Sequence, residues 1–271
     1  MTEPIAVAVN GAMGRMGMQI SKLLLEDPSC SIVAVVEKKG HPSVGVDIGT
    51  VVSSRKSGVL VSDDFNDIKG RVDCIIDFSA PASTLSVLRY AQDRHISMVI
   101  GTTGFSAKTE MEAIHRAGSE TAIVMAPNMS VLMNVVFKLV ELSARALGGS
   151  YDAEIVEAHH RNKVDAPSGT ALKLADIIAH AYGRPLEEIA RYERHGAVGA
   201  RRSGEIGIQS LRGGDVVGEH TVMFIGAGER LEITHRATSR ENFAQGAVLA
   251  AKWAAGKQPG LYSMAEVLGL T

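Results

Sequence analysis

The chain has 271 residues, of which 45% are hydrophobic and 21% are charged, a composition typical of a packed globular protein rather than a disordered chain. Its formal net charge of -2 provides no general attraction to nucleic acid or to an anionic membrane. We therefore predict neither a nucleic-acid nor a membrane partner, and we expect any recognition of anions to be local.

Short apolar runs alternate with amphipathic segments in the first half of the chain. The predicted strands lie at residues 5–9, 32–36, 72–79, 96–104 and 121–128, and the predicted helices at 16–25, 81–95 and up to about 118. Continuous apolar strands separated by helices indicate a parallel sheet that is covered on both faces. We predict a doubly wound, Rossmann-like α/β domain over residues 1–128.

The pattern changes in the second half. A long apolar helix is predicted at 131–147, followed by strands of period two at 152–160, 206–214, 219–228 and 230–238. This predicts a second, α+β domain at 129–239 with a largely antiparallel sheet. An amphipathic helix begins after Thr238, and we expect the segment from about 240 to 271 to pack back on the first domain.

Two cysteines, Cys30 and Cys74, lie in or beside apolar runs without a zinc-type spacing, so we predict buried thiols. The N-terminus lacks the pattern of a secretory signal, and no apolar run reaches the roughly 18 residues of a membrane span. We expect a soluble, cytoplasmic protein.

A glycine cluster with the spacing GxxGxxG, residues 11–17, lies where the first strand becomes the first helix. Glycines there let the backbone approach a pyrophosphate, which the helix N-terminus stabilises. A plain glycine-rich turn is the alternative. Glu37 favours a dinucleotide because it ends the second strand, where a carboxylate can bind a ribose hydroxyl. Lys38 and Lys39 are either counter-charges for a 2′-phosphate or residues of a solvated turn.

Other predicted strand ends converge on the same edge of the sheet. Phe78-Ser79, residues 101–104 and residues 126–129 each follow an apolar strand. Ligands of open α/β sheets bind beyond the carboxyl ends of the strands. Asn128 can bind a cofactor here or serve as a helix cap or turn residue.

Two adjacent histidines mark the stretch EAHHRNKVDAPSGTA at 157–171. His159 and His160 follow a predicted strand, so their side chains point to opposite sides and cannot easily share a metal ion. No zinc-type spacing completes the set, and we predict no metal site. An acid/base role suits a histidine, and Lys163 can bind a carboxylate or donate a proton. Each residue taken singly can also be a solvated loop residue.

Ser168-Gly169-Thr170 immediately precedes an apolar helical pattern at 171–182. Either hydroxyl can cap this helix, and the free N–H groups of its first turn can instead bind an anion. Beside His160 and Lys163, such a helix start suits a small dicarboxylate.

A set of motifs spans nearly the whole chain: GAMGRMG, IDFSAP, IGTTGF, EAHHRNKVDAPSGTA, GEHTVMF and ERLEITHRA. Together and in this order they resemble the family of 4-hydroxy-tetrahydrodipicolinate reductases, also called dihydrodipicolinate reductases, of lysine biosynthesis. The resemblance implies a homotetramer that is assembled through the sheet of the second domain. It also implies reduction of a cyclic dicarboxylate by NADH or NADPH with loss of water.

The resemblance also implies roles for individual residues. His159 becomes the acid/base catalyst and Lys163 the proton donor, while His160, Ser168, Gly169 and Thr170 bind the substrate carboxylate. Cofactor contacts fall on Gly11, Ala12, Met13, Gly14, Arg15, Met16, Glu37, Lys38, Gly101, Thr102, Thr103, Ala126, Pro127, Asn128 and Met129. Some members of the family have arginine where this chain has Lys38, which leaves the preference for NADPH open.

Two other functions compete with this interpretation. Another two-domain nicotinamide oxidoreductase, such as an amino-acid dehydrogenase, shares the nucleotide half but does not require HHRxKxDAPSGT. A non-catalytic NAD(H)-sensing protein requires only the glycine cluster. For the reductase we expect hinge motion near 127–131 and 236–241.

Overall fold

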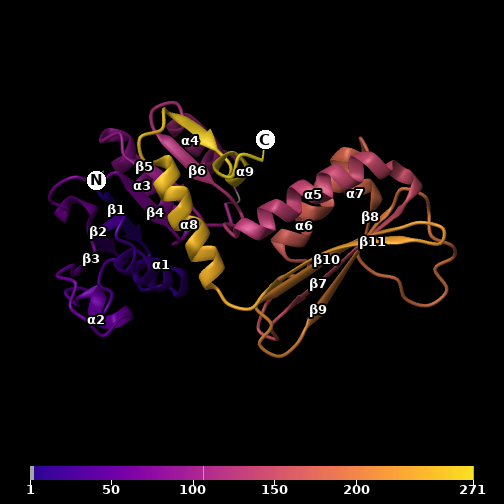
Figure 1. Cartoon of the computed structure of the whole chain (residues 1–271), viewed down its shortest axis with the longest axis horizontal. Helices are drawn as coiled ribbons and strands as arrows, with labels where there is room; N and C mark the ends of the chain where they lie inside the picture. The colour runs from indigo at the N-terminus through magenta and orange to yellow at the C-terminus, as the bar shows by residue number, and fades with distance from the viewer. Residues whose placement is uncertain (1–2, 106, 271) are drawn as a thin grey trace. The chain divides into compact units, whose positions relative to one another are not determined.

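The computed structural model describes residues 3–105 and 107–270. The chain divides into two compact units, of which unit 1 is Met1–Val131 with Arg240–Thr271 and unit 2 is Leu132–Ser239. Each unit is built around its own sheet. Figure 1 labels the elements along the chain.

The described part of unit 1 contains a seven-stranded sheet with the order β12-β6-β5-β4-β1-β2-β3 and parallel pairings. Its strands are β1 (Ile5–Asn10), β2 (Cys30–Val36), β3 (Val61–Ser62), β4 (Cys74–Asp77), β5 (Ser97–Ile100), β6 (Ala122–Met125) and β12 (Gly260–Tyr262). The winding reverses between β1 and β4, as in doubly wound folds. The predicted Rossmann-like sheet is therefore confirmed.

Helices cover both faces of this sheet. They are α1 (Arg15–Glu26), α3 (Pro81–Asp93), α4 (Lys108–Ala117) and α8 (Glu241–Ala254), and the short elements are α2 (Ile48–Val52), η1 (Phe65–Asp67) and α9 (Met264–Val267). One core contains residues of α1 and α8, and the other contains residues of α3 and α4. Because neighbouring strand residues point to opposite faces, Ile76 joins the first core and Ile75 the second.

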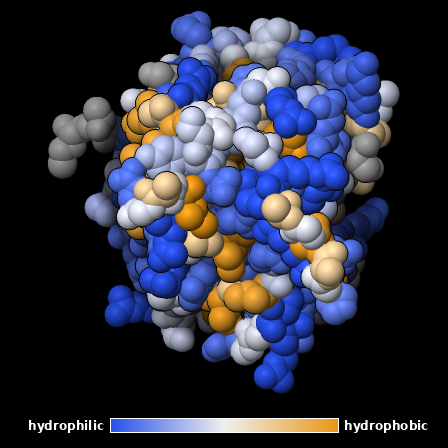
Figure 2. Space-filling view, turned by 90° about the vertical axis from the view of Figure 1, so that its right-hand side faces the viewer, coloured by the Kyte–Doolittle hydropathy of each residue, from blue (hydrophilic) through white to orange (hydrophobic). Residues whose placement is uncertain are grey.

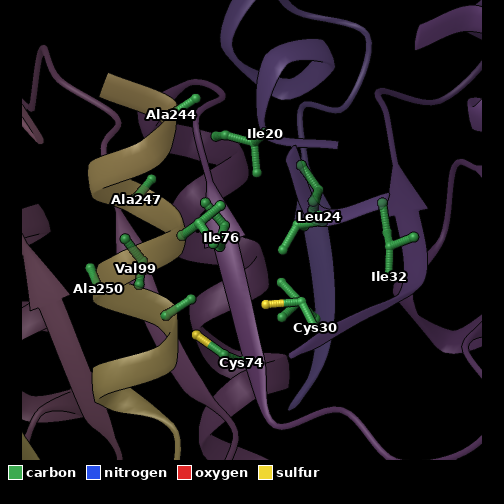
Figure 3. Packing of buried hydrophobic residues seen from close by; sticks show 14 of the residues in the cluster. Ile20, Leu24, Cys30, Ile32, Cys74, Ile76, Val99, Ala244, Ala247 and Ala250 are labelled. Atoms are coloured by element: carbon green, nitrogen blue, oxygen red, sulfur yellow. The ribbon is translucent and has the colours of Figure 1, made fainter. Parts of the chain in front are cut away.

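Helix α8 comes from the far end of the sequence and lies against this sheet. Figure 3 shows Ala244, Ala247 and Ala250 of α8 beside Ile76 and Val99 of the sheet. The small alanine side chains allow a close approach, and a Cβ on Gly246 would lie only 1.8 Å from the carbonyl oxygen of Met129. The final 30 or so residues thus complete the core of unit 1 and add the edge strand β12, which the sequence pattern did not predict.

Unit 2, which is described throughout, contains a five-stranded sheet with the order β11-β10-β7-β9-β8. Its elements are α5 (Val131–Leu147), η2 (Gly148–Ser150), β7 (Asp152–His159), α6 (Gly169–Ala181), α7 (Leu186–Ile189), β8 (Ala190–Arg191), β9 (Ile206–Arg212), β10 (Gly218–Ile225) and β11 (Arg230–Ala237). Apolar residues of α5 and α6 pack against inward-facing residues of the sheet, among them Ile155, Val222 and Phe224.

The expectation of a largely antiparallel sheet in unit 2 is wrong. β10 pairs antiparallel with β7 and β11, but β9 pairs parallel with β7 and β8. Two connections produce this arrangement: α6 and α7 lead from β7 to β8, and the segment 192–205 then returns the chain so that β9 runs in the same direction between them. The sheet is therefore mixed, and this arrangement brings the ends of β7 and β9 together.

The predicted buried thiols are confirmed, because Cys30 and Cys74 are both free and buried. They lie in the core shown in Figure 3, where burial raises the pKa of each thiol. Among the residues that the structure describes, no helix has the length and apolar character needed to cross a membrane.

Candidate functional site

The glycine cluster forms a tight turn between β1 and α1. Gly11 has a φ of 73°, and a Cβ there would lie 2.7 Å from the carbonyl oxygen of Phe78. A Cβ on Gly17 would lie 2.2 Å from the carbonyl oxygen of Gly11, so both positions require glycine. Gly14 is the N-cap of α1 without a side-chain hydrogen bond, which leaves the helix start suited to an anion.

The other residues of this turn differ in exposure. Gly14 and Arg15 are exposed, Met13 and Met16 are half-buried, and Ala12 is buried. Only the exposed and half-buried side chains can therefore contact a ligand directly, whereas Ala12 can contribute through its backbone.

Glu37 connects this turn to the end of β2. Its Oε2 accepts a hydrogen bond from the Met13 N–H at 3.1 Å, and its Oε1 accepts one from the Lys38 N–H at 2.9 Å. Glu37, Lys38 and Lys39 line a cavity of about 470 Å³ in unit 1, together with Asn10, Tyr90 and Arg94 among others. The Arg94 guanidinium lies 4.0 Å from the centre of the Tyr90 ring. These two residues form part of the cavity lining, and the sequence did not indicate them.

Asp77, at the end of β4, organises the neighbouring strand ends. It is fully buried and accepts hydrogen bonds from Asn10 at 2.7 Å, Ser79 at 2.5 Å, Thr102 at 3.1 Å and also Thr84. Burial raises the pKa of the Asp77 carboxyl, and these hydrogen bonds oppose the rise. Asp77 lies within the motif IDFSAP, but the sequence did not predict its role.

Several predicted cofactor residues have structural contacts of their own. The Thr102 hydroxyl accepts a hydrogen bond from the Ser79 N–H at 2.9 Å and is almost fully buried. A Cβ on Gly101 would overlap the Phe78 ring, whereas the side chain of Thr103 is exposed. Thr103 and the backbone of this segment are therefore the parts that remain accessible to a ligand.

The last predicted cofactor segment follows β6. Ala126 and Met129 are buried and belong to a core of unit 1, while Pro127 is exposed. The Asn128 Oδ1 accepts a hydrogen bond from the Ser130 N–H at 2.9 Å, so Asn128 has the turn role that the sequence left open beside cofactor binding.

His159 ends β7 and turns its ring toward a buried acid on the same face of the strand. Its Nδ1 lies 2.6 Å from Oε2 of Glu157, whose side chain is 0% exposed, while 12% of the His159 side chain is exposed. Burial lowers the pKa of His159, and the hydrogen bond to Glu157 opposes this shift. The lowered pKa favours the neutral form of the ring.

Glu157 also holds the start of α6. Its Oε1 accepts a hydrogen bond from the N–H of Ser168, the N-cap of α6, at 3.1 Å. The Ser168 Oγ accepts a hydrogen bond from the Ala171 N–H at 3.1 Å and lies 2.9 Å from Nε2 of the buried His220. The structure thus brings His159 and Ser168 together through one carboxylate.

The remaining predicted residues lie on the turn after β7 and on the first turn of α6. The Lys163 Nζ lies 2.9 Å from both carboxylate oxygens of Asp165, and this hydrogen bond lowers the pKa of Asp165. His160 is half-buried and accepts a backbone hydrogen bond from Lys163 at 3.1 Å. Gly169 is exposed, with open space where a Cβ would lie, and Thr170 is half-buried.

Comparison with protein families accounts for both units. Residues 5–129 match the model described as dihydrodipicolinate reductase, N-terminus, and residues 133–268 match the model described as dihydrodipicolinate reductase, C-terminus. The chain belongs to the dihydrodipicolinate reductase family.

Curated members of the reductase family match at nearly full length. A 4-hydroxy-tetrahydrodipicolinate reductase of Syntrophus aciditrophicus is 50% identical over 261 residues, which cover 96% of this chain and 97% of the relative. One of Anaeromyxobacter dehalogenans is 48% identical, with 97% of each protein covered. The resemblance inferred from the sequence motifs is therefore confirmed.

Two solved structures share the fold of this chain. The dipicolinate-bound dihydrodipicolinate reductase from Paenisporosarcina sp. TG-14 superposes with a TM-score of 0.74 at 25% identity, covering 97% of this chain and 98% of that one. An amine dehydrogenase from Mycobacterium smegmatis has a TM-score of 0.60 at 13% identity, with 97% and 95% covered, and shows a shared fold alone.

Three residues behind the site of this reductase family member were not predicted from the sequence: the buried Glu157 and His220 and the half-buried Arg212. The period of two in β7 already places Glu157 on the inward face with Ala153 and Ile155, a signal that was available. No sequence signal linked Arg212 to it. Within the described residues, no group of three or more His, Cys, Asp or Glu side chains is arranged to hold a metal ion.

Proposed function

We propose that the chain reduces 4-hydroxy-tetrahydrodipicolinate to tetrahydrodipicolinate, with loss of water and oxidation of NADH or NADPH, in the diaminopimelate route to lysine. The observation that carries the proposal is the match of both units to the dihydrodipicolinate reductase family, with about half of the residues identical to curated reductases. It makes the protein an oxidoreductase and disfavours an amino-acid dehydrogenase or an NAD(H) sensor.

The residues of unit 1 fit a nicotinamide dinucleotide, which supplies a hydride when bound. The Gly11 turn and the uncapped start of α1 suit its pyrophosphate, and Glu37 lies beside them at the cavity of unit 1. Lys38 and Lys39 line the same cavity and can stabilise a 2′-phosphate as point charges. We therefore propose that the enzyme accepts both cofactors.

Proton handling falls to His159 and Lys163. Since burial lowers the pKa of His159, its ring is neutral at neutral pH and can accept a proton at Nε2. Lys163 forms an ion pair with Asp165, with 20% of its side chain exposed, and its ammonium group is the proposed proton donor.

The substrate carboxylate is proposed to bind at the start of α6. Ser168, Gly169 and Thr170 form its first turn, where backbone N–H groups and the helix dipole favour an anion. His160 precedes it on the adjoining turn. The dipicolinate described for the Paenisporosarcina reductase supports a small dicarboxylate as the ligand.

We further propose a homotetramer in the cytoplasm, formed through the sheet of unit 2. Its helices pack on one face of the sheet, while Val156, Thr221 and Met223 lie on the other. Hydrophobic side chains interrupt the hydrophilic surface in Figure 2, and unit 2 exposes Leu211 at 57%. Light scattering of the wild type and of Met223→Glu tests the assembly, since a monomeric wild type would refute it.

A coupled assay tests the reaction directly. Aspartate semialdehyde, pyruvate and the preceding synthase generate the substrate, and loss of nicotinamide absorbance is followed with NADH and NADPH separately. We expect oxidation of the cofactor that depends on the synthase. If neither cofactor is oxidised, the proposed function is wrong, whereas turnover of amino acids in place of this substrate would favour the dehydrogenase.

A further inference from the structure

The carboxylate of Glu157 is fully buried and surrounded by hydrogen-bond donors from three different segments. Its Oε1 accepts hydrogen bonds from the Ser168 N–H at 3.1 Å and from Arg212 Nη2 at 2.8 Å. Its Oε2 accepts one from Arg212 Nη1 at 2.8 Å and lies 2.6 Å from Nδ1 of His159. Beside the bidentate arginine, Oε1 therefore contacts the start of α6 and Oε2 contacts His159.

The ion pair keeps this carboxylate charged. Burial raises the pKa of Glu157, but hydrogen bonds from Arg212 and His159, together with those from Ser210 and Ser168, outweigh it and lower the pKa to about 2. An ionised carboxylate can only accept hydrogen bonds, so the hydrogen of the neutral His159 ring must lie on Nδ1. The lone pair is then on Nε2.

Gly218 of β10 lies beside Nε2 of His159. A Cβ built on Gly218 would lie 3.1 Å from this nitrogen, tighter than most real Cβ contacts, and glycine avoids that contact. His220, two residues along the same strand, lies against the His159 ring with the ring centres 5.2 Å apart. The His159 ring is thus fixed from one side by Glu157 and from another by His220, while its Nε2 remains unobstructed by Gly218.

Arg212 extends the same network to the loop that carries Lys163. Its Nη2 donates a hydrogen bond to the carbonyl oxygen of Asp165 at 2.8 Å, in addition to the one it gives to Glu157. The Asp165 side chain in turn holds Lys163. One arginine therefore connects the buried carboxylate to the turn between β7 and α6.

We propose that Glu157 is a positioning residue that keeps His159 in the Nδ1–H tautomer and, through the same carboxylate, ties it to the substrate-binding start of α6. Arg212 holds Glu157 in place for this role. One buried carboxylate, that of Glu157, then positions both the histidine that transfers the proton and the helix start that binds the substrate carboxylate. The kinetic consequences rest on the proposed function, but the tautomer of His159 does not.

Nitrogen NMR of the labelled wild-type protein tests the tautomer without any substrate. The His159 signals are assigned by their loss in His159→Gln. We expect the shifts of a neutral imidazole with the hydrogen on Nδ1 at neutral pH. A His159 ring with the hydrogen on Nε2 would overturn the proposal, even if the coupled assay shows full reductase activity.

Kinetics of Glu157→Gln test the consequence for catalysis. The amide offers an N–H group toward His159 and favours the wrong tautomer, so kcat should fall by about 10²-fold or more while KM for NADH changes little. Glu141→Gln is the control, because Glu141 also lies in unit 2 and pairs with an arginine, Arg145, but belongs to α5 and not to the sheet face proposed to form the tetramer. It should keep nearly wild-type kcat, and an equal loss in both variants would overturn the proposal.

Two further readouts separate positioning from a general structural role. His159 is faced by the charges of Glu157, Arg212 and Lys163 and by His220. Without the negative charge of Glu157, the limb of the pH profile that follows His159 should move to lower pH.

Adding Glu157→Gln to His159→Gln should cause no further loss of kcat, and additive losses would show that Glu157 does not act through His159.

Discussion

Replacing Glu157 by glutamine should change how the stability of unit 2 depends on pH. Burial raises the pKa of Glu157, but its hydrogen bonds, above all that from Arg212, lower the pKa from 4.5 to about 2 in the folded protein. A carboxylate with a depressed pKa stabilises the fold above its unfolded pKa, and this contribution is lost as the pH falls through the folded pKa. This pKa shift contributes about 3 kcal/mol to the free energy of unfolding at neutral pH, of which about 2 kcal/mol is lost by about pH 3.

Urea unfolding at a series of pH values measures this difference. Unit 2 is followed by hydrogen exchange of the β7 amides, residues 152–159, and unit 1 by the fluorescence of Trp253, the single tryptophan, in α8. Between about pH 7 and about pH 3, the free energy of unfolding of unit 2 should fall by about 2 kcal/mol more in the wild type than in Glu157→Gln. The pH dependence of the Trp253 signal should be the same in both proteins.

The variant also leaves Arg212 with a weaker partner, so it is expected to be less stable than the wild type at neutral pH. That loss alone does not test the reasoning, because many core substitutions destabilise. The test is whether the free energy of unfolding of unit 2 falls more steeply with falling pH in the wild type than in the variant. Parallel pH dependences of unit 2 in the two proteins would refute the assignment of a depressed pKa to Glu157.

Three further predictions concern other residues of the two units. His159→Gln should lower kcat by about 10²–10⁴-fold with little change in KM, whereas Lys163→Ala should impair both, as measured in the coupled assay. Gly218→Ala should lower kcat by at least about tenfold, because the added methyl group lies against Nε2 of His159, while β10 remains folded by circular dichroism. Gly17→Ala should destabilise unit 1 by about 1–3 kcal/mol in urea and weaken NADH binding, since its Cβ meets the backbone of Gly11.

The sequence was sufficient for most of unit 1 because its signals are local. Apolar strands and amphipathic helices alternate there, and the glycine turn at residue 11 requires a φ that other residues rarely adopt. The edge strand β12 was missed because three half-buried residues do not produce a period. Its place depends on pairing with β6, a contact made across more than a hundred residues.

In the candidate site of unit 2, local sequence patterns predict some residues but not others. The alternation in β7 places Glu157 and His159 on one face, so a buried acid beside the histidine follows from the sequence. Its partner does not, because Arg212 lies opposite His159 only in the parallel register of β7 and β9. An antiparallel pairing of the same two strands would bring different residues to the end of β7.

The helix after β7 therefore does two things for the site. It lies on the path from β7 to β8, after which β9 pairs parallel with β7 and brings Arg212 to Glu157. With its first turn, the same helix presents the Ser168 N–H to that carboxylate. Because Glu157 accepts hydrogen bonds from both Arg212 and the Ser168 N–H, a change that moved the start of α6 would disturb the ion pair and the first turn of α6 together.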